Sequence, residues 1–570
     1  MRIRILSLVL VLIFALLFLS VFGLAVVHRP RYSQMSKRNS IRLLPQSGAR
    51  GVILDRNGKV IVESYLSYDV MIVPQDGNST DKTIKTLSGI LEISPSELRK
   101  RFRTRGSSGI SAATLAKNID IKKAIALEEL KVELPGIIIQ PHPIRSYPYG
   151  RLACHVIGYL NEIDRWRLTK LSDYGYKTKD IVGFGGVEEK YDYYLRQEEG
   201  GLSFVVDSRG NQVHALGYRP PTSGRNIQLT LDLEIQKIVE EEMGERKGAV
   251  IIIDPSNGEI LGMASRPGFN PEAFIKKEAS YVRRLFNDSQ APFINRAITG
   301  LYPAGSVFKL VVATAALEKK KISSGTSFKC TGSIRIGGSR FSCWNTHGDT
   351  SIVAGIARSC NVFFWRTGLL TGAKLIHAYA VRFGMARETN VDIPYESVGQ
   401  VPNTVWRRLS KFQKWYDGDT ANLSIGQGEL MVTPIQLLRM ICVFANKGSL
   451  VRPYLLKAVG EQDISSYQRK VTSMGLKQST ISTINQGLRG TISDPEGTAN
   501  ILSGLSVSIA GKTGTAQVGR AEAHGWFVGY FPYKSPKFAI CVFLENSGSG
   551  YVSGVLAKKI IERMIKEGLI

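Results

Sequence analysis

Acidic residues are scarce in this chain of 570 residues, where 48 aspartates and glutamates stand against 74 lysines and arginines. The resulting formal net charge of +26 would suit a nucleic-acid-binding protein. However, the basic residues are spread along the chain, with no arginine-rich tail and no nucleic-acid-binding motif. We therefore expect no nucleic-acid partner and favour attraction to anionic lipid headgroups or polymers, with a merely well-solvated basic surface as the alternative.

Long apolar runs are absent except at residues 5–27, which are uncharged and long enough to cross a bilayer with some tilt. The run exceeds a signal-peptide core and no convincing cleavage site follows it, so we interpret it as a retained single-pass anchor. Basic residues flank the run on both sides, so charge alone does not orient it. Large domains cross membranes largely regardless of charge, which allows residues 1–4 to be cytoplasmic and the rest to lie outside.

Standard C-x-x-C pairs are also lacking among the six cysteines. Cys442 and Cys541 lie in apolar runs and are predicted to be small core residues, whereas Cys154, in a segment predicted to be a strand, has no evident partner. Three thiols and one imidazole form a complete tetrahedral ligand set for zinc: Cys330, Cys343, His347 and Cys360. In an oxidising compartment the alternative is a Cys330–Cys343 disulfide, and the third reading is a set of unlinked thiols.

The composition, 43% hydrophobic and 21% charged, excludes a mostly disordered chain, and the length predicts two or three domains. A break rich in proline and glycine at 219–225 separates an N-terminal region, 28–220, from a C-terminal domain, 225–570. Within the first of these, an Asn57-Gly58 turn predicts a hairpin at 48–62.

The C-terminal domain shows strand patterns at both of its ends. Hairpins are predicted at 248–264 and 526–544, and helices at 233–243 and 555–566. Because the segments between them are largely helical, we expect an antiparallel sheet that is completed late in the chain and flanked by helices.

The strongest chemical signal is the sequence YPAGSVFK at 302–309, which runs into an apolar segment. Pro303 and Gly305 break the preceding chain, and a helix is predicted from Ser306 onward, with Ser306 and Lys309 one turn apart on one face. A serine needs a proton acceptor to become a nucleophile, and a lysine can serve only if burial or a second cation lowers its pKa. An ordinary helix start before a surface lysine would give the same short pattern.

Two further motifs follow in order along the chain. Ser359 and Asn361 belong to S-C-N at 359–361, and Lys512 begins K-T-G-T at 512–515, in a predicted strand. S-x-x-K, S-x-N and K-T-G together are the motif set of penicillin-binding proteins and class A β-lactamases. The sequence therefore resembles that superfamily.

Other segments resemble class B penicillin-binding proteins, and their elongation-specific members in particular. These segments are RGVILDRNG at 50–58, RSYPYG at 145–150, HVIGY at 155–159, GFGGVEEKY at 183–191, SIGQG at 424–428 and HGWFV at 524–528. The resemblance implies a multidomain α+β fold with a transmembrane helix, an elongated non-catalytic dimerisation or pedestal domain at 28–220, and a serine-β-lactamase-like transpeptidase domain at 225–570. Arg145, Glu188 and Tyr191 are expected to be structural or to bind a partner. His524 is expected to be structural or to lie at the edge of the substrate site, without acting as a catalytic base.

The resemblance also implies an activity, that of a serine-type D-alanyl-D-alanine transpeptidase of peptidoglycan, inhibited by β-lactams and with D,D-carboxypeptidase activity as a side reaction. Ser306 would form the acyl-enzyme, and Lys309 would be the general base, kept neutral partly by the charge of Lys512. Ser359 would relay a proton to the leaving amine, and Asn361 would hold the substrate amide. The terminal carboxylate of the substrate would bind to the K-T-G-T segment: Lys512, Thr513, Gly514 and Thr515. Backbone N–H groups of Ser306 and Thr515 would form the oxyanion hole.

The partners implied by the resemblance are stem peptides on lipid-linked or nascent glycan strands, β-lactams, a SEDS-family glycosyltransferase, other elongation-complex proteins and the membrane. The catalytic domain would lie on the extracytoplasmic, periplasmic side of the cytoplasmic membrane. No glycosyltransferase-like domain is visible before residue 220, so the protein would cross-link strands without polymerising them. No cofactor is expected for catalysis, and a zinc ion in the cysteine cluster would be structural, as elongation-type members include some with metal ligands in this stretch.

Three other functions are also compatible with the sequence. The first is a division-specific class B transpeptidase, and the second is a β-lactamase, which would need neither an anchor nor a long first domain. The third is a non-enzymatic β-lactam sensor or scaffold, which would acylate and stop.

Overall fold

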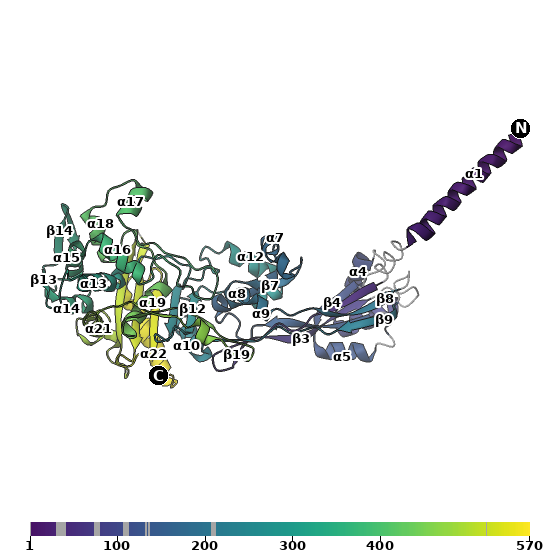
Figure 1. Ribbon diagram of the computed structural model, residues 1–570. Coiled ribbons are helices and arrows are strands. Elements are labelled where there is room, and N and C mark those ends of the chain that lie inside the picture. The colour runs from purple at the N-terminus through teal and green to yellow at the C-terminus, as the bar shows by residue number, and fades with distance from the viewer. Residues whose placement is uncertain are drawn as a thin grey trace. The chain divides into compact units, whose positions relative to one another are not determined.

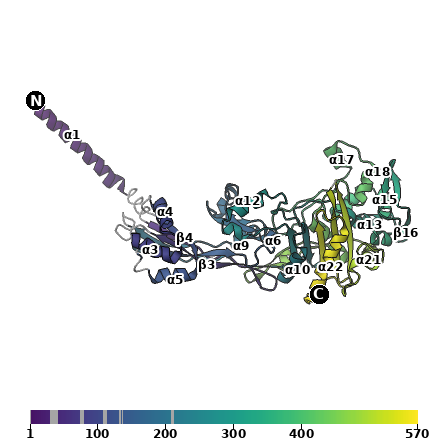
Figure 2. The same ribbon diagram turned by 180° about the vertical axis from the view of Figure 1, so that it is seen from behind.

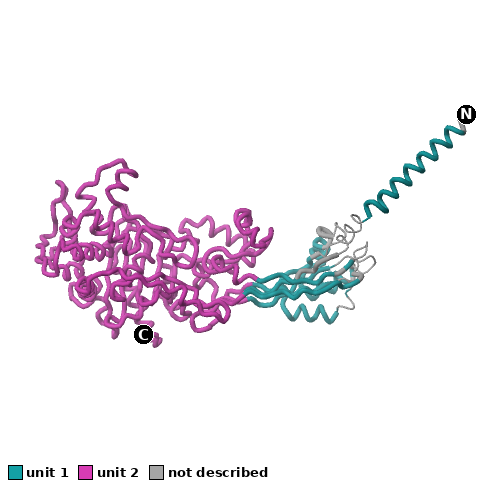
Figure 3. Tube along the Cα trace, viewed as in Figure 1, with its two compact units in different colours: residues 1–50, 64–144, 197–224 teal, residues 51–63, 145–196, 225–570 magenta. Residues whose placement is uncertain are grey.

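The computed structural model describes residues 2–29, 41–72, 80–106, 113–130, 134, 137–206, 212–519 and 521–570. They fall into two compact units (Figure 3). Unit 1 holds residues 1–50, 64–144 and 197–224, and unit 2 holds residues 51–63, 145–196 and 225–570. The region expected at 28–220 therefore contributes to both units.

The N-terminal helix α1 (Arg2–Phe22) continues into a π-helical turn, η1 (Gly23–Val27). Residues Arg4–Val27 are apolar and long enough to cross a membrane, and within the described part of the chain no second helix meets this criterion. The large apolar side chains of this helix are exposed, from Ile5 to Val27. Its length and composition fit the anchor predicted at 5–27.

The remainder of unit 1 is a small α+β unit. The sheet β1-β8-β9 is antiparallel throughout, and β4 pairs antiparallel with β3. A separate apolar core forms between the strands and helices, around Val70, Leu87, Leu115 and Leu127. The bounds are β1 (Ile41–Gln46), β3 (Val60–Ile72), α3 (Thr80–Leu91), α4 (Pro95–Gly106), β4 (Ala113–Ile119), α5 (Ile121–Glu129), β5 (Ile137–Ser146), β8 (Gly200–Val206) and β9 (Gln212–Arg219), with β3 and β5 extending into unit 2.

Two early segments join unit 2 through specific contacts. Strand β2 (Ile53–Leu54) pairs in parallel with β10 (Ile227–Leu229) and forms the predicted hairpin with the start of β3 around Gly58. Arg145 forms a buried ion pair with Glu188 and donates a hydrogen bond to the carbonyl oxygen of Gly51. These contacts explain why the N-terminal region does not form a single unit in chain order.

Unit 2 is built on a five-stranded antiparallel sheet in the order β12-β11-β23-β22-β21. Of these strands, β12 is labelled in Figure 1. The strands are β11 (Gly248–Ile253), β12 (Ile260–Arg266), β21 (Ala510–Val518), β22 (Ala521–Phe531) and β23 (Phe538–Leu544). The first hairpin thus joins the last three strands through the pairing of β11 with β23, which confirms the predicted sheet and its hairpins.

Both faces of this sheet are buried against an apolar core. Because side chains alternate between the two faces, each strand contributes residues to both cores. Val250 and Ile252 belong to a core shared with α10 (Leu233–Met243) and α22 (Gly550–Lys566), the two helices seen together in Figure 2. Ala249 and Ile251 face the opposite core. The predicted helix 233–243 is confirmed, and the closing helix begins at Gly550, earlier than the expected 555.

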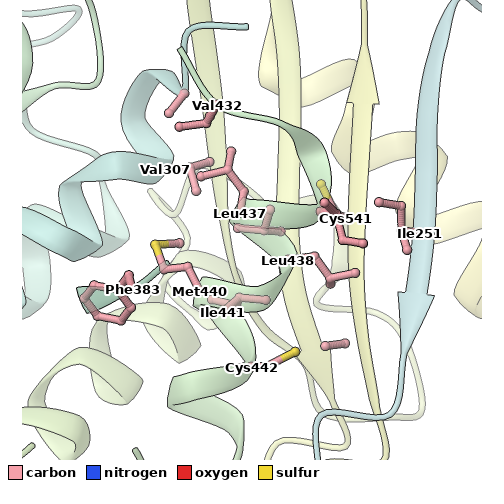
Figure 4. Packing of buried hydrophobic residues seen from close by; sticks show 14 of the residues in the cluster. Ile251, Val307, Phe383, Val432, Leu437, Leu438, Met440, Ile441, Cys442 and Cys541 are labelled. Carbon is pink, nitrogen blue, oxygen red and sulfur yellow. The ribbon is translucent and has the colours of Figure 1, made fainter. Parts of the chain in front are cut away.

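The opposite core is the larger one and contains α19 (Pro434–Ala445). Leu437 and Leu438 of this helix lie beside Cys541 of β23 and Ile251 of β11 (Figure 4). Cys442 and Cys541 have no exposed surface, which confirms them as small core residues. Cys154 was expected in a strand but begins the short helix α6 (Cys154–Ile157), which follows a left-handed residue, Ala153.

The remaining elements of unit 2 surround these cores. The elements before the third motif are β6 (Tyr159–Glu162), α7 (Arg165–Leu171), η2 (Ser172–Tyr174), β7 (Ile181–Phe184), α8 (Gly186–Lys190), α9 (Asp192–Leu195), α11 (Glu272–Ile275), α12 (Ala279–Asn287), η3 (Gly305–Phe308), α13 (Lys309–Glu318), β13 (Ser327–Cys330), β14 (Ser333–Ile336), β15 (Ser339–Ser342), β16 (Gly348–Ser351), α14 (Ile352–Ala357), α15 (Asn361–Thr371), α16 (Ala373–Arg382), α17 (Thr404–Lys411) and α18 (Asp417–Ser424). After α19 come β17 (Ser449–Val451), β18 (Leu456–Val459), β19 (Gln462–Asp463), α20 (Ser465–Gln468), β20 (Val471–Ser473), α21 (Gln478–Ser493) and η4 (Asn500–Leu502).

Candidate active site

A cleft of about 960 Å³ opens in unit 2 where η3, the start of α15 and strand β21 meet. All three sequence motifs contribute to its walls, although they lie far apart in the chain. The predicted site residues that line it are Ser306, Ser359, Asn361, Thr513, Gly514 and Thr515. Lys309 and Lys512 are not among the lining residues, since both side chains are fully buried behind the surface of the cleft.

Ser306 lies in a short 3₁₀-helical turn, η3, and α13 begins only at Lys309. In a 3₁₀-helix three residues make one turn, so residues three apart are eclipsed and Ser306 and Lys309 share one face. Gly305 has a positive φ of 55°, and a side chain there would meet the carbonyl oxygen of Thr515 at 2.7 Å. Glycine at this position thus lets the serine turn approach β21 closely.

Lys309 is held by three hydrogen bonds from its ammonium group. Its Nζ lies 2.7 Å from the carbonyl oxygen of Ser359, 3.1 Å from Ser359 Oγ and 2.7 Å from Asn361 Oδ1. Burial lowers the pKa of Lys309 to about 7, against an opposing effect of Cys343 and Cys360. The first and second motifs are therefore joined directly through this lysine.

Lys512 donates to the carbonyl oxygen of Thr513 at 3.0 Å. Burial, and after it the charge of Lys309, lower the pKa of Lys512 well below its usual value. We expected the charge of Lys512 to help keep Lys309 neutral. Burial is the main cause of the lowered pKa at both lysines, and the repulsion between the two cations adds to it.

The hydroxyl groups of the third motif face the cleft from β21. Thr513 Oγ1 lies 2.5 Å from Thr498 Oγ1, and Thr515 Oγ1 accepts a hydrogen bond from the backbone N–H of Gly550 at 3.0 Å. Because Gly550 begins helix α22, the positive end of that helix lies beside Thr515. This wall of the cleft is suited to an anionic group.

Ser359 lies between helices α14 and α15 in the left-handed region, with a φ of 54°. Cys360 caps α15, since its Sγ accepts a hydrogen bond from the backbone N–H of Phe363. Trp344 donates from its indole Nε1 to the carbonyl oxygen of Ser359 at 3.3 Å. The strained position of Ser359 is thus fixed by contacts on both sides.

The four predicted metal ligands come together, with their ligand atoms all within 4.8 Å of one another. His347 Nδ1 lies 3.6 Å from the Sγ atoms of both Cys330 and Cys343. The backbone N–H of Asn361 donates to Cys343 Sγ at 3.3 Å. All six cysteines, each within the described residues, are unlinked, so the alternative Cys330–Cys343 disulfide is not formed.

Several lining residues lie outside the motifs and were not predicted, among them Arg340, Trp344, Thr498 and Tyr551. They come from separate loops, strands and helix ends, so no spacing in the sequence groups them. The sequence did contain one pattern that could have indicated further lining residues, the segment SIGQG at 424–428. Gln427 and Gly428 of this segment line the cleft.

The residues expected to be structural lie outside the lining of the cleft. Arg145 and Glu188 form a buried ion pair, and Tyr191 donates to Asp392 Oδ2 at 2.7 Å. His524 is buried, its Nδ1 accepts a hydrogen bond from the backbone N–H of Asn546, and burial lowers its pKa. A neutral histidine with this contact fits a structural role.

Comparison with known proteins gives matches over nearly the whole chain. A family model described as the penicillin binding protein transpeptidase domain matches residues 248–566, and one described as the penicillin-binding protein dimerisation domain matches residues 45–229. The chain is 31% identical over 575 residues to the peptidoglycan D,D-transpeptidase MrdA of Acinetobacter baumannii, covering 95% of this chain and 84% of that one.

Two solved structures are similar in fold. Penicillin-binding protein 2 of Helicobacter pylori, in a complex with MreC, matches with a TM-score of 0.80 and 26% identity, over 93% of this chain and 99% of that chain. A structure titled as the coordination of polymerization and crosslinking by a peptidoglycan synthase complex matches with a TM-score of 0.75 and 27% identity, over 98% and 97%.

The left-handed backbone at Ser359 predicts an unusual order of stability. Ser359→Gly and Ser359→Ala both remove the hydroxyl, but only glycine adopts a positive φ without steric cost. We expect the glycine variant to be more stable than the alanine variant by about 1 kcal/mol, measured from the midpoint of denaturant unfolding. At Ser410, an exposed position within α17, the same pair of substitutions should show the opposite order. Equal stability of the two Ser359 variants would contradict the assignment of strain.

Proposed function

Because the chain belongs to the penicillin-binding protein transpeptidases, we propose that it is a peptidoglycan D,D-transpeptidase that cross-links stem peptides in cell-wall elongation through an acyl-enzyme on Ser306. The comparisons confirm the family resemblance and the multidomain α+β fold that it implied. The observation that carries the proposal is the meeting of three distant motifs at one cleft, with Lys309 buried behind Ser306 and bonded to Ser359 and Asn361.

The first step is attack by Ser306 Oγ on the carbonyl carbon between the last two D-alanines of a stem peptide. The Oγ–C bond forms, the peptide C–N bond breaks, and D-alanine leaves as an amine after gaining a proton. Lys309 takes the proton from Ser306, for which its pKa of about 7 leaves a large neutral fraction at neutral pH. β-Lactams acylate the same serine.

The three contacts of Lys309 support a route for that proton. A neutral lysine has two N–H donors and one lone pair. The carbonyl oxygens of Ser359 and Asn361 can only accept, so they take the two N–H groups, and the lone pair is left for the proton of Ser306. Once protonated, Lys309 donates its third N–H to Ser359 Oγ at 3.1 Å. Ser359 can then pass a proton from Lys309 to the leaving amine. An incoming amine of a second stem peptide reverses these transfers and takes the acyl group.

Substrate binding is assigned to the opposite wall. Thr513 and Thr515 hold the terminal carboxylate with their hydroxyl groups, beside the positive end of α22. Lys512 supports them from behind through the carbonyl oxygen of Thr513, and Gly514 keeps the strand close to Val307 of η3. Asn361 holds the substrate amide, and backbone N–H groups of Ser306 and Thr515 form the oxyanion hole.

The wider arrangement follows from the anchor and the relatives. Residues 5–27 are proposed as a single-pass anchor in the cytoplasmic membrane, with 28–220 as the non-catalytic domain and 225–570 as the transpeptidase domain on the extracytoplasmic side. The Helicobacter pylori relative is in a complex with MreC, and the second structure is of a peptidoglycan synthase complex. We therefore propose elongation-complex partners, including a SEDS-family glycosyltransferase.

The cysteine cluster fits a structural zinc ion. With Zn–S near 2.3 Å and Zn–N near 2.0–2.1 Å, tetrahedral geometry separates sulfur from nitrogen by about 3.6 Å. His347 Nδ1 lies 3.6 Å from two of the sulfurs. Zinc would be held by Cys330, Cys343, His347 and Cys360. Because Asn361 N–H donates to Cys343 Sγ, zinc would stiffen the second motif without touching substrate.

The function is tested with benzylpenicillin and intact-mass spectrometry of the full chain in detergent. We expect one stable adduct on wild-type protein and none on Ser306→Ala, because only Ser306 is placed as the nucleophile. Turnover of a D-alanyl-D-alanine donor with an amine acceptor should also be lost in the variant, which separates an enzyme from a sensor. Rapid loss of the adduct with drug hydrolysis would instead indicate a β-lactamase.

The pKa of Lys309 predicts a pH dependence of acylation. Protonated Lys309 cannot accept the serine proton, so the rate should be low below pH 7 and rise as the lysine loses its proton. With a pKa of about 7, the rate constant for acylation by benzylpenicillin should rise about tenfold from pH 6 to 8. A flat profile across this range would rule out Lys309 as the base.

Zinc is tested by elemental analysis of purified full-length protein. We expect about one zinc per chain, lost in Cys343→Ser and retained in the control Cys154→Ser, which lies outside the cluster. Chelation should lower the melting temperature of the wild type and of Cys154→Ser but not that of Cys343→Ser, since bound metal stabilises the folded state. A metal-free protein with a Cys330–Cys343 disulfide in its peptide mass map would disprove the site.

A further inference from the structure

The cleft is almost free of charge. Among the described residues that line it, Arg340 is the one with a charged side chain, and no aspartate or glutamate lines it. Lys309 and Lys512 are not among the lining residues, and both side chains are fully buried and held by carbonyl and hydroxyl groups. Of the described lining residues, Arg340 alone therefore offers a ligand a positive charge, on the side formed by β15.

Arg340 belongs to a two-stranded hairpin, β14 and β15, that is attached firmly to the core of unit 2. Ile336 of β14 is buried, and Phe341 of β15 contacts the ring of Trp365 edge-on at 5.5 Å. The backbone N–H of Cys343 donates to the carbonyl oxygen of Gly332 at 2.8 Å and closes the base of the hairpin. Figure 1 shows β14 beside α18, where Gly418 lies close to Phe341.

The register of the hairpin places a second arginine directly opposite Arg340. Arg335 of β14 pairs with Arg340 of β15, so both side chains leave the same face of the hairpin. Like charges directly opposite each other destabilise a hairpin, and within the described part of the chain neither guanidinium forms an ion pair with a carboxylate. Ser333 Oγ accepts a hydrogen bond from Arg340 Nε at 3.2 Å, which orients the guanidinium.

We propose that Arg340, with Arg335 opposite it, forms an anion subsite of the cleft that binds a second carboxylate of an acidic stem peptide, distinct from the terminal one. The inference rests on the proposed function and specifies the chemistry of its substrate. The terminal carboxylate is assigned to Thr513 and Thr515 on β21, so a carboxylate further along the peptide is the anion left to complement the arginine pair. An oriented guanidinium binds a carboxylate through two parallel N–H groups, which gives direction as well as charge.

If Arg340 forms this subsite, the affinity of the protein for a stem peptide should depend on the negative charge of the second carboxylate of the peptide. The probes are two pentapeptides ending in D-alanyl-D-alanine that differ only in whether the α-carboxylate of a γ-linked D-glutamate is free or amidated. Their dissociation constants are measured on full-length Ser306→Ala protein, which binds without reacting. Adding Arg340→Gln should weaken binding of the acidic peptide about fivefold to twentyfold and that of the amidated peptide less than twofold. The preference of the parent protein for the acidic peptide should shrink at high salt.

A matched control removes the same charge elsewhere. Arg408 is exposed on α17, outside the lining of the cleft, so Arg408→Gln should leave both dissociation constants unchanged. Equal weakening of both peptides by Arg340→Gln, or no weakening of either, would overturn the subsite, and so would a failure of the parent protein to bind either peptide. The penicillin adduct on wild-type protein reports separately on the nucleophile, so the subsite can fail while the transpeptidase assignment stands.

Discussion

The burial of Lys309 is the constraint on which the rest of the site depends. A lysine with no exposed surface is tolerated only if its charge is reduced and its N–H groups are bonded, and both conditions hold here. Its partners are Ser359 and Asn361, so the position of the second motif follows from the needs of the first. The left-handed Ser359, the Trp344 contact and the cysteine cluster then act together to keep those partners in place.

The third motif is coupled to the first by backbone packing instead of side-chain bonds. Gly305 and Gly514 lack the side chains that would hold η3 and β21 apart, so the serine turn lies against the strand. This brings the proposed nucleophile and its buried lysine to one side of a single cleft and the proposed carboxylate-binding wall to the other. Two buried lysines near each other are compatible because burial suppresses both charges.

Much of the site could be predicted from the sequence, because each motif keeps its chemistry within a few adjacent residues. The anchor, the hairpins and helix 233–243 were recognisable from local patterns for the same reason. The interleaving of residues 51–63 and 145–196 with the C-terminal part, and the place of Arg340 in the cleft, could not be predicted, since each depends on contacts between distant segments. Cys154 was assigned to a strand because a short apolar run does not distinguish strand from helix.

The strand order of the central sheet has a consequence for biosynthesis. Strands β11 and β12 are the first of this sheet to be made, but β23, the neighbour of β11, is among the last segments to be synthesised, and β21, which precedes it, carries the third motif. Until those strands arrive, the apolar faces of the first hairpin and of α19 have no sheet to cover them. Such a topology folds slowly and exposes apolar surface to other chains in the meantime. A nascent chain of this kind would depend on chaperones until its C-terminal segment is released.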